Sequence, residues 1–160
     1  MKRRSVLAAA VGACTTGWSQ SRPFLVISGK LGNSNAGAEH HFTEGEFLAL
    51  PQSTIVTATA WTPKSRWDGP RVDAVLKHVQ AASGDRLRVS ALDDYYITIP
   101  WEDIQRWGIL LAHSRDGVRL GRNRWGPLFI IYPRDDYPRE LNTPMTEAKF
   151  IWQVGRIDVE

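Results

Sequence analysis

We expect the rest of the chain to be organised around the stretch Arg119-Leu-Gly-Arg-Asn-Arg-Trp-Gly-Pro-Leu-Phe-Ile-Ile-Tyr-Pro-Arg-Asp-Asp136. Its centre, Leu128 to Tyr132, is an uninterrupted run of aliphatic and aromatic residues with a proline at each end. A continuous apolar run fits a strand that is covered on both faces better than a strand with one solvated face. The sequence therefore predicts a central strand at this position.

Charged residues flank this predicted strand on both sides. In chain order the flanks carry Arg119, Arg122, Arg124, Trp125, Arg134, Asp135 and Asp136. Because binding sites often form on loops that a rigid scaffold holds in place, both flanks are candidate site segments. The alternative is that these charges only solvate the strand ends, as charged residues on protein surfaces usually do.

The composition indicates one globular domain with a neutral body. The chain has 160 residues, of which 42% are hydrophobic and 23% charged, and it contains no visible internal repeat. The formal charge is +3, and Lys2, Arg3 and Arg4 account for all of it. A neutral body lacks the basic footprint of nucleic-acid-binding proteins, so no nucleic-acid partner is predicted.

Residues 1–22 have the layout of an export signal, with a basic start, a short apolar stretch and small residues at its end. The only cysteine, Cys14, follows Val-Gly-Ala as in bacterial lipoprotein signals, so a lipid anchor on Cys14 is one prediction. Arg3-Arg4 fits the twin-arginine route, while simple cleavage near Trp18 to Ser21 and a retained amino-terminal helix also stay open. The predicted domain is 23–160, and its predicted location is the periplasm or the cell envelope.

The predicted mature domain has no pair of cysteines, so it can form neither a disulfide nor a thiolate metal site of its own. His40-His41 lie near Glu39 and Glu44, but they lack the fixed spacing of known metal motifs. No metal ligand set is therefore predicted. His78 and His113 are expected to be structural.

Strands outnumber helices in the predicted element order. Strand-like runs cover 24–28, 54–60, 86–91, 95–99, 109–113, 118–120, 128–132 and 150–159. Short helices are predicted after the capping box Thr43-x-x-Glu46, after Asp68-Gly69-Pro70 as far as Gly84, and over 100–107. Loops are predicted over 61–67 and 134–149. This order argues for an α+β fold in which a strand-rich mixed sheet carries short helices.

Five segments in this order resemble the molybdopterin-binding domain of the sulfite-oxidase family. They are Thr57-Ala-Thr-Ala-Trp61, Trp67-x-Gly69-Pro70, Asp93-Asp94-Tyr95, Gly126-Pro127-Leu128 and Trp152-x-x-x-Arg156-Ile157. The resemblance covers nearly all of the chain from Phe24 to Val159. It implies the mixed, strand-rich α+β domain of that family, an oxidoreductase activity and a molybdenum–molybdopterin cofactor.

The chain departs from the family pattern at three positions. The family ligates molybdenum through a cysteine in the loop that here reads Thr59-Ala60-Trp61. A threonine hydroxyl is neutral and does not replace a soft, anionic thiolate. Phe129 stands where the pattern has an arginine, and Ile151 stands where it has a lysine, with Lys149 close by.

Two functions from different classes follow from these observations. The first is a small exported oxidoreductase of the molybdopterin class with altered metal ligation. The second is a cofactor-free binding, sensing or accessory module on the same fold, with a membrane-anchored or periplasmic protein partner.

For a pterin or another planar anion, the expected ligand site combines cations with aromatic rings. Arg66, Arg122 and Arg124 are the candidate cations, because guanidinium groups match phosphate oxygens. Trp61 and Trp125 are candidate aromatic walls, together with Trp67. Thr59 is included because it lies where the family has its cysteine. Against this stand surface ion pairs with Asp116 or Asp135 for the arginines and ordinary packing for the tryptophans.

The sequence leaves the catalytic residues unknown. Asp94 and Tyr95 are the candidates for acid–base chemistry, because a carboxylate and a phenol are adjacent in a predicted turn. The alternative is that both are solvated turn residues.

Overall fold

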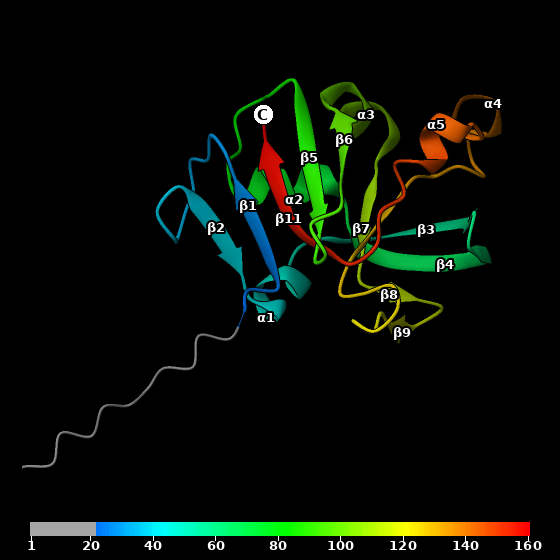
Figure 1. The fold of residues 1–160 in the computed structure, drawn as a ribbon, viewed down its shortest axis with the longest axis horizontal. Helices are drawn as coiled ribbons and strands as arrows, with labels where there is room; N and C mark the ends of the chain where they lie inside the picture. The colour runs from blue at the N-terminus through cyan, green and yellow to red at the C-terminus, as the bar shows by residue number, and fades with distance from the viewer. Residues whose placement is uncertain (1–21) are drawn as a thin grey trace, which may run out of the picture.

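A computed structural model describes residues 22–160, and the predicted export signal with Arg3, Arg4 and Cys14 lies outside this range (Figure 1). The strands are β1 (Leu25–Ser28), β2 (Glu39–Phe42), β3 (Gln52–Thr59), β4 (Thr62–Pro70), β5 (Arg86–Ala91), β6 (Tyr96–Pro100), β7 (Leu110–Ala112), β8 (Ser114–Arg115), β9 (Val118–Arg119), β10 (Phe129–Ile131) and β11 (Val154–Val159). The helices are α1 (Glu44–Leu48), α2 (Val72–His78), α3 (Trp101–Trp107), α4 (Pro138–Leu141) and α5 (Pro144–Glu147). The architecture is α+β with short helices, as predicted.

The main sheet has five strands in the order β2-β1-β11-β5-β6. It is a mixed sheet, because β11 runs parallel to β1 and antiparallel to β5. The helix α2 lies behind this sheet in Figure 1 and buries Val72, Val75 and Leu76. The central strand of the five is β11, which is the last strand in the sequence.

The run Leu128 to Tyr132 is fully buried, as predicted, with all five side chains at 0% exposure. The prediction that it is the central strand is wrong, because its strand β10 pairs only with β7 in a two-stranded sheet. On its other side, the amide of Ile130 donates to the carbonyl of Ile151, and the amide of Val154 donates to the carbonyl of Leu128. An irregular segment that precedes β11 thus takes the place of a second strand partner.

The strands β3 and β4 form a long hairpin, and β8 and β9 extend it to a four-stranded sheet. The prediction of a loop over 61–67 is therefore wrong from Thr62 onward, because these residues belong to β4. Ser65 and Trp67 are buried, whereas Lys64 and Arg66 are exposed, so the burial alternates as in a strand. Short polar side chains on the inner face hide this pattern in the sequence.

The helix α1 begins as predicted. Thr43 accepts a hydrogen bond from the amide of Glu46 (3.2 Å), and the Glu46 carboxylate accepts one from the amide of Thr43 (3.3 Å). The predicted start of α2 at Pro70 is wrong, because Pro70 still belongs to β4 and Arg71 is the N-cap. The helix also ends at His78, well before Gly84.

Two further boundaries differ from the predictions. The predicted loop over 134–149 contains α4 and α5, each of which has a proline in its first turn. The last strand begins at Val154 rather than at Phe150. No helix among residues 22–160 is long and apolar enough to cross a membrane.

Candidate functional site

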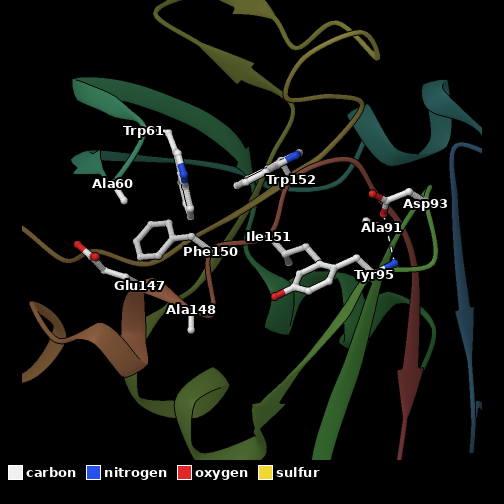
Figure 2. Close-up of a pocket in the computed structure, with 10 residues that line it drawn as sticks. All are labelled: Ala60, Trp61, Ala91, Asp93, Tyr95, Glu147, Ala148, Phe150, Ile151 and Trp152. Carbon is white, nitrogen blue, oxygen red and sulfur yellow. Dashed lines mark hydrogen bonds between the residues drawn. The ribbon is translucent and has the colours of Figure 1, made fainter.

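A pocket with a volume of about 420 Å³ opens where three segments meet: the β3–β4 turn, the β5–β6 turn and the segment from α5 to β11 (Figure 2). Its lining consists of Ala60, Trp61, Ala91, Asp93, Tyr95, Glu147, Ala148, Phe150, Ile151 and Trp152. Ligand sites are typically such concave, mainly apolar surfaces with a few polar groups. This pocket is therefore the candidate binding site.

The pocket has a buried floor and exposed aromatic walls. Phe150 and Ile151 are 4% and 2% exposed, whereas Trp61 and Tyr95 are 46% and 59% exposed. Trp152 meets Trp61 edge to face, with ring centroids 4.6 Å apart and an interplanar angle of 76°. The rings of Trp61 and Tyr95 thus remain accessible to a molecule in the pocket.

The β3–β4 turn positions Trp61. The buried hydroxyl oxygen of Thr59 accepts hydrogen bonds from the amides of Trp61 (3.2 Å) and Thr62 (3.1 Å). The same oxygen lies 2.9 Å from the hydroxyl of Thr62. Thr59 therefore holds the turn closed and keeps the backbone of Trp61 at its tip.

The β5–β6 turn positions Tyr95. The carboxylate of Asp93 accepts a hydrogen bond from the amide of Tyr95 at 3.2 Å. Asp94 has a φ of 67°, a left-handed conformation that aspartate tolerates in turns. Of the two catalytic candidates, only Tyr95 lines the pocket, and Asp93 lines it in place of Asp94.

The charge of the pocket comes from two carboxylates. Glu147 lies toward one end and Asp93 toward the other (Figure 2). Glu147 is also bonded to Arg134, with 2.8 Å between the guanidinium nitrogen Nη1 and the oxygen Oε1. Among the described residues that line the pocket, none is basic.

The β3–β4 turn and the loop before β10 meet at Trp152. Trp125 meets Trp152 at 5.3 Å in an edge-to-face arrangement and stacks on Phe129 at 5.8 Å. The Nε1 atom of Trp125 is buried and has no hydrogen-bond partner within residues 22–160. Trp61 and Trp125 thus contact the same ring, but only Trp61 lines the pocket.

The three candidate arginines lie away from the pocket. Arg66 is exposed on β4 and pairs with Asp68 at 3.0 Å. Arg122 is exposed, and its carbonyl accepts a hydrogen bond from the side chain of Gln153. Arg124 lies over the ring of Trp125, with 5.6 Å between its carbon Cζ and the ring centroid.

Asp135 lies near the hairpin that carries Trp61. Its carboxylate accepts a hydrogen bond from the hydroxyl of Thr57 (3.1 Å) and lies 3.4 Å from the ammonium of Lys64. Burial by itself raises the pKa of Asp135, but the bonds from Thr57 and Lys64 outweigh it and hold this pKa below its usual value. Asp135 is therefore a structural carboxylate that stays ionised.

The residues at the three family departures do not fit molybdenum ligation. Thr59 is neutral and engaged in the turn, and the only cysteine of the chain, Cys14, lies outside the described residues. Phe129 is fully buried against Trp67, with 5.2 Å between the ring centroids. Lys149 pairs with Asp103 at 2.6 Å, and Ile151 belongs to the pocket floor.

Eight lining residues were not among the candidate site residues from the sequence: Ala60, Ala91, Asp93, Glu147, Ala148, Phe150, Ile151 and Trp152. Ala60, Asp93 and Trp152 belong to three of the five resemblance segments, and Ile151 stands where the family pattern has a lysine, so the resemblance is the signal that could have found these four. The other four have no local signal, because the pocket forms only when segments far apart in the chain meet.

Comparison with known proteins supports a related fold only. Neither a protein-family model nor a curated protein sequence matches the chain. Among solved structures, the sulfane dehydrogenase SoxCD from Paracoccus pantotrophus is similar, with a TM-score of 0.60 and 14% sequence identity. The alignment covers 84% of this chain and 37% of that one. The chain thus shares a fold with part of a dehydrogenase.

Proposed function

We propose that this protein is a binding module whose pocket takes a planar heteroaromatic ligand of the pterin class. The observation that carries the proposal is the pocket itself, with an apolar floor at Phe150 and Ile151 and accessible rings at Trp61 and Tyr95. Flat rings gain from contact with aromatic faces and edges, by about 0.5–1.5 kcal/mol per pair beyond their buried area.

The two carboxylates define the polar part of the ligand. A pterin ring carries N–H donors along one edge, and carboxylates such as Asp93 and Glu147 accept such bonds. The sequence predicted an anionic ligand held by Arg66, Arg122 and Arg124, but these arginines do not line the pocket. The proposed ligand therefore presents a neutral or cationic, hydrogen-donating edge to the pocket.

The export of the protein is part of this proposal and rests on residues 1–22. The basic start and the sequence Val-Gly-Ala-Cys14 support a periplasmic or envelope location, with a lipid on Cys14 and an envelope protein as partner. Mass spectrometry of the protein from bacterial membranes should find the residues before Cys14 removed and a lipid added. A full-length, unmodified cytoplasmic product would contradict export.

A molybdopterin-dependent oxidoreductase is the second candidate. It is supported by the sequence resemblance and by the distant likeness to a dehydrogenase. The donor set argues against it, because Thr59 supplies no thiolate. Protein purified from a host that makes the pterin cofactor is expected to carry far less than one molybdenum per chain, and Thr59→Cys or Ala60→Cys is expected to raise that content. Stoichiometric molybdenum in the unaltered protein would favour the oxidoreductase.

Tryptophan fluorescence tests the binding function directly. A neutral pterin should quench the emission in a saturable manner, and Asp93→Asn should weaken binding several-fold, because it removes the charge but keeps an acceptor for the amide of Tyr95. Asp94→Asn is the matched control, since Asp94 is the next residue and does not line the pocket. The absence of saturable quenching, or equal weakening in the two variants, would contradict the proposal.

A further inference from the structure

A second cluster of polar side chains lies on elements that do not contribute to the pocket. It joins His40 on β2, Glu46 on α1 and His78 at the end of α2. The Nε2 atom of His40 is 3.2 Å from the Glu46 oxygen Oε1, and the Nε2 atom of His78 is 3.9 Å from the same oxygen. One potential ligand atom from each residue lies within 4.8 Å of the other two.

The hydrogen bonds around His40 assign the tautomer of its ring. Its Nδ1 atom lies 3.1 Å from the carbonyl oxygen of Asn33, which can only accept, so Nδ1 carries a proton. In the neutral ring, Nε2 then presents a lone pair toward Glu46. The other oxygen of Glu46, Oε2, accepts from the amide of Thr43 in the capping box.

Two acceptors therefore face each other at a buried position, since His40 is only 3% exposed. A lone pair and a carboxylate oxygen at 3.2 Å repel unless a positive charge lies with them. Either a proton on His40 or a metal cation can provide that charge.

The third residue and the geometry favour the cation. Zinc binds nitrogen and oxygen at about 2.0–2.1 Å, so two ligand atoms of one tetrahedral ion lie about 3.3 Å apart. The separation between His40 and Glu46 matches this value, whereas His78 lies 3.9 Å from the same oxygen and must move toward the other two ligands to reach it. A carbonyl that accepts from the second ring nitrogen is also the usual outer partner of a zinc-bound histidine.

We propose that His40, Glu46 and His78 bind one divalent transition-metal cation of the zinc class. Two imidazoles and a carboxylate suit this class of cation, and they leave a fourth position for water or another ligand. Glu46 and His78 are 33% and 36% exposed on their side chains, so that position opens toward solvent. The bound cation connects β2, α1 and α2.

This inference differs from the prediction made from the sequence, which found no metal ligand set. The histidines considered as metal ligands from the sequence were the adjacent pair His40-His41, but only His40 belongs to the cluster. His41 pairs with Glu39 at 2.7 Å instead. The two residues that complete the set come from other elements.

Zinc titration of the full-length protein tests the proposal. The chain should carry no histidine tag, and Cys14→Ser should be introduced because a thiol is itself a zinc ligand. Calorimetry of chelator-treated protein should find one zinc ion per chain, and cobalt in its place should give visible absorption bands of tetrahedral type. His78→Ala should lower the zinc affinity by more than about 100-fold, because loss of an outer partner alone costs 10–100-fold. His41→Ala is the matched control and should bind like the parent.

Glu46→Gln separates metal binding from folding. A glutamine retains the capping box, and its amide can donate to the lone pair of His40, so the metal-free variant should unfold at or above the temperature of the metal-free parent. Added zinc should raise the unfolding temperature of the parent and of His41→Ala, but not that of Glu46→Gln. No zinc uptake by the parent, or equal uptake by the parent and Glu46→Gln, would overturn the proposal. Both outcomes are independent of the pterin pocket, which shares no residue with this cluster.

Discussion

Trp61 and Trp67 lie on the same hairpin and have opposite environments. Trp67 is 0% exposed, its Nε1 donates to the carbonyl of Thr57 at 3.1 Å, and its ring meets Phe129. Trp61 is 46% exposed at the turn and forms a wall of the pocket. Trp67, with a satisfied N–H and complete packing, is therefore a structural residue, whereas the accessible ring of Trp61 beside a buried floor is available to a ligand.

The largest expected effect is on the free energy of unfolding, when the buried Trp67 is replaced. Trp67→Ala should lower the free energy of unfolding by about 3–5 kcal/mol, because it leaves a cavity beside Phe129. Chemical denaturation followed by circular dichroism measures this loss, and Trp67→Phe should recover part of it. A loss below about 1 kcal/mol would mean that Trp67 is not a core residue.

The next effect concerns the turn that carries Trp61. Thr59→Val keeps the shape of the side chain but leaves the part-buried amide of Trp61 and the buried amide of Thr62 without the hydroxyl acceptor. The expected cost is about 1–3 kcal/mol of unfolding free energy, measured by denaturation. An unchanged denaturation midpoint would indicate that the turn forms without this hydroxyl.

Because the side chain of Trp61 is exposed, Trp61→Ala should lower ligand affinity rather than the free energy of unfolding. The affinity for a pterin should fall by about 0.5–1.5 kcal/mol, the value of one aromatic pair, in a fluorescence titration that uses the remaining tryptophans. Trp61→Phe keeps a ring and should bind more tightly than the alanine variant. If Trp61→Ala lowers stability as much as Trp67→Ala does, the contrast between the two residues fails.

The smallest expected effect is the pH dependence that comes from Asp135, which bonds to Thr57, the partner of Trp67. Because the pKa of Asp135 is lowered in the folded chain, the ionised form stabilises the fold above its unfolded pKa of about 3.8. This contribution is lost as the pH falls through the lower, folded pKa. Unfolding measured between about pH 5 and pH 2 should therefore show a weaker pH dependence in Asp135→Asn. Identical slopes in the variant and the parent would contradict this role.

Several elements could be predicted because their signals are local. The capping box at Thr43 and Glu46 and the apolar run from Leu128 to Tyr132 depend on a few consecutive residues, and both agree with the structure. The strand β4 was missed because Thr62 and Ser65 are buried in place of large apolar residues. The extent of α2 was misjudged because Pro70, a common helix-starting residue, here ends a strand.

The candidate site was only partly predictable. Trp61 and Tyr95 line the pocket, whereas Arg66, Arg122 and Arg124 do not. The sequence orders these residues along the chain, but it does not say which way each side chain points from its strand or turn. One residue of shift along a strand moves a side chain to the opposite face.

The α+β class, the short helices and the buried apolar strand could be read from local patterns, because hydrophobic periodicity, capping residues and turn residues act over a few neighbouring positions. Three features are visible only in the folded chain: β11 is the central strand, Trp61 is accessible while Trp67 is buried, and His40, Glu46 and His78 meet. These features depend on contacts between residues far apart in the chain. Such contacts are chosen by the packing of the whole core, to which every element contributes.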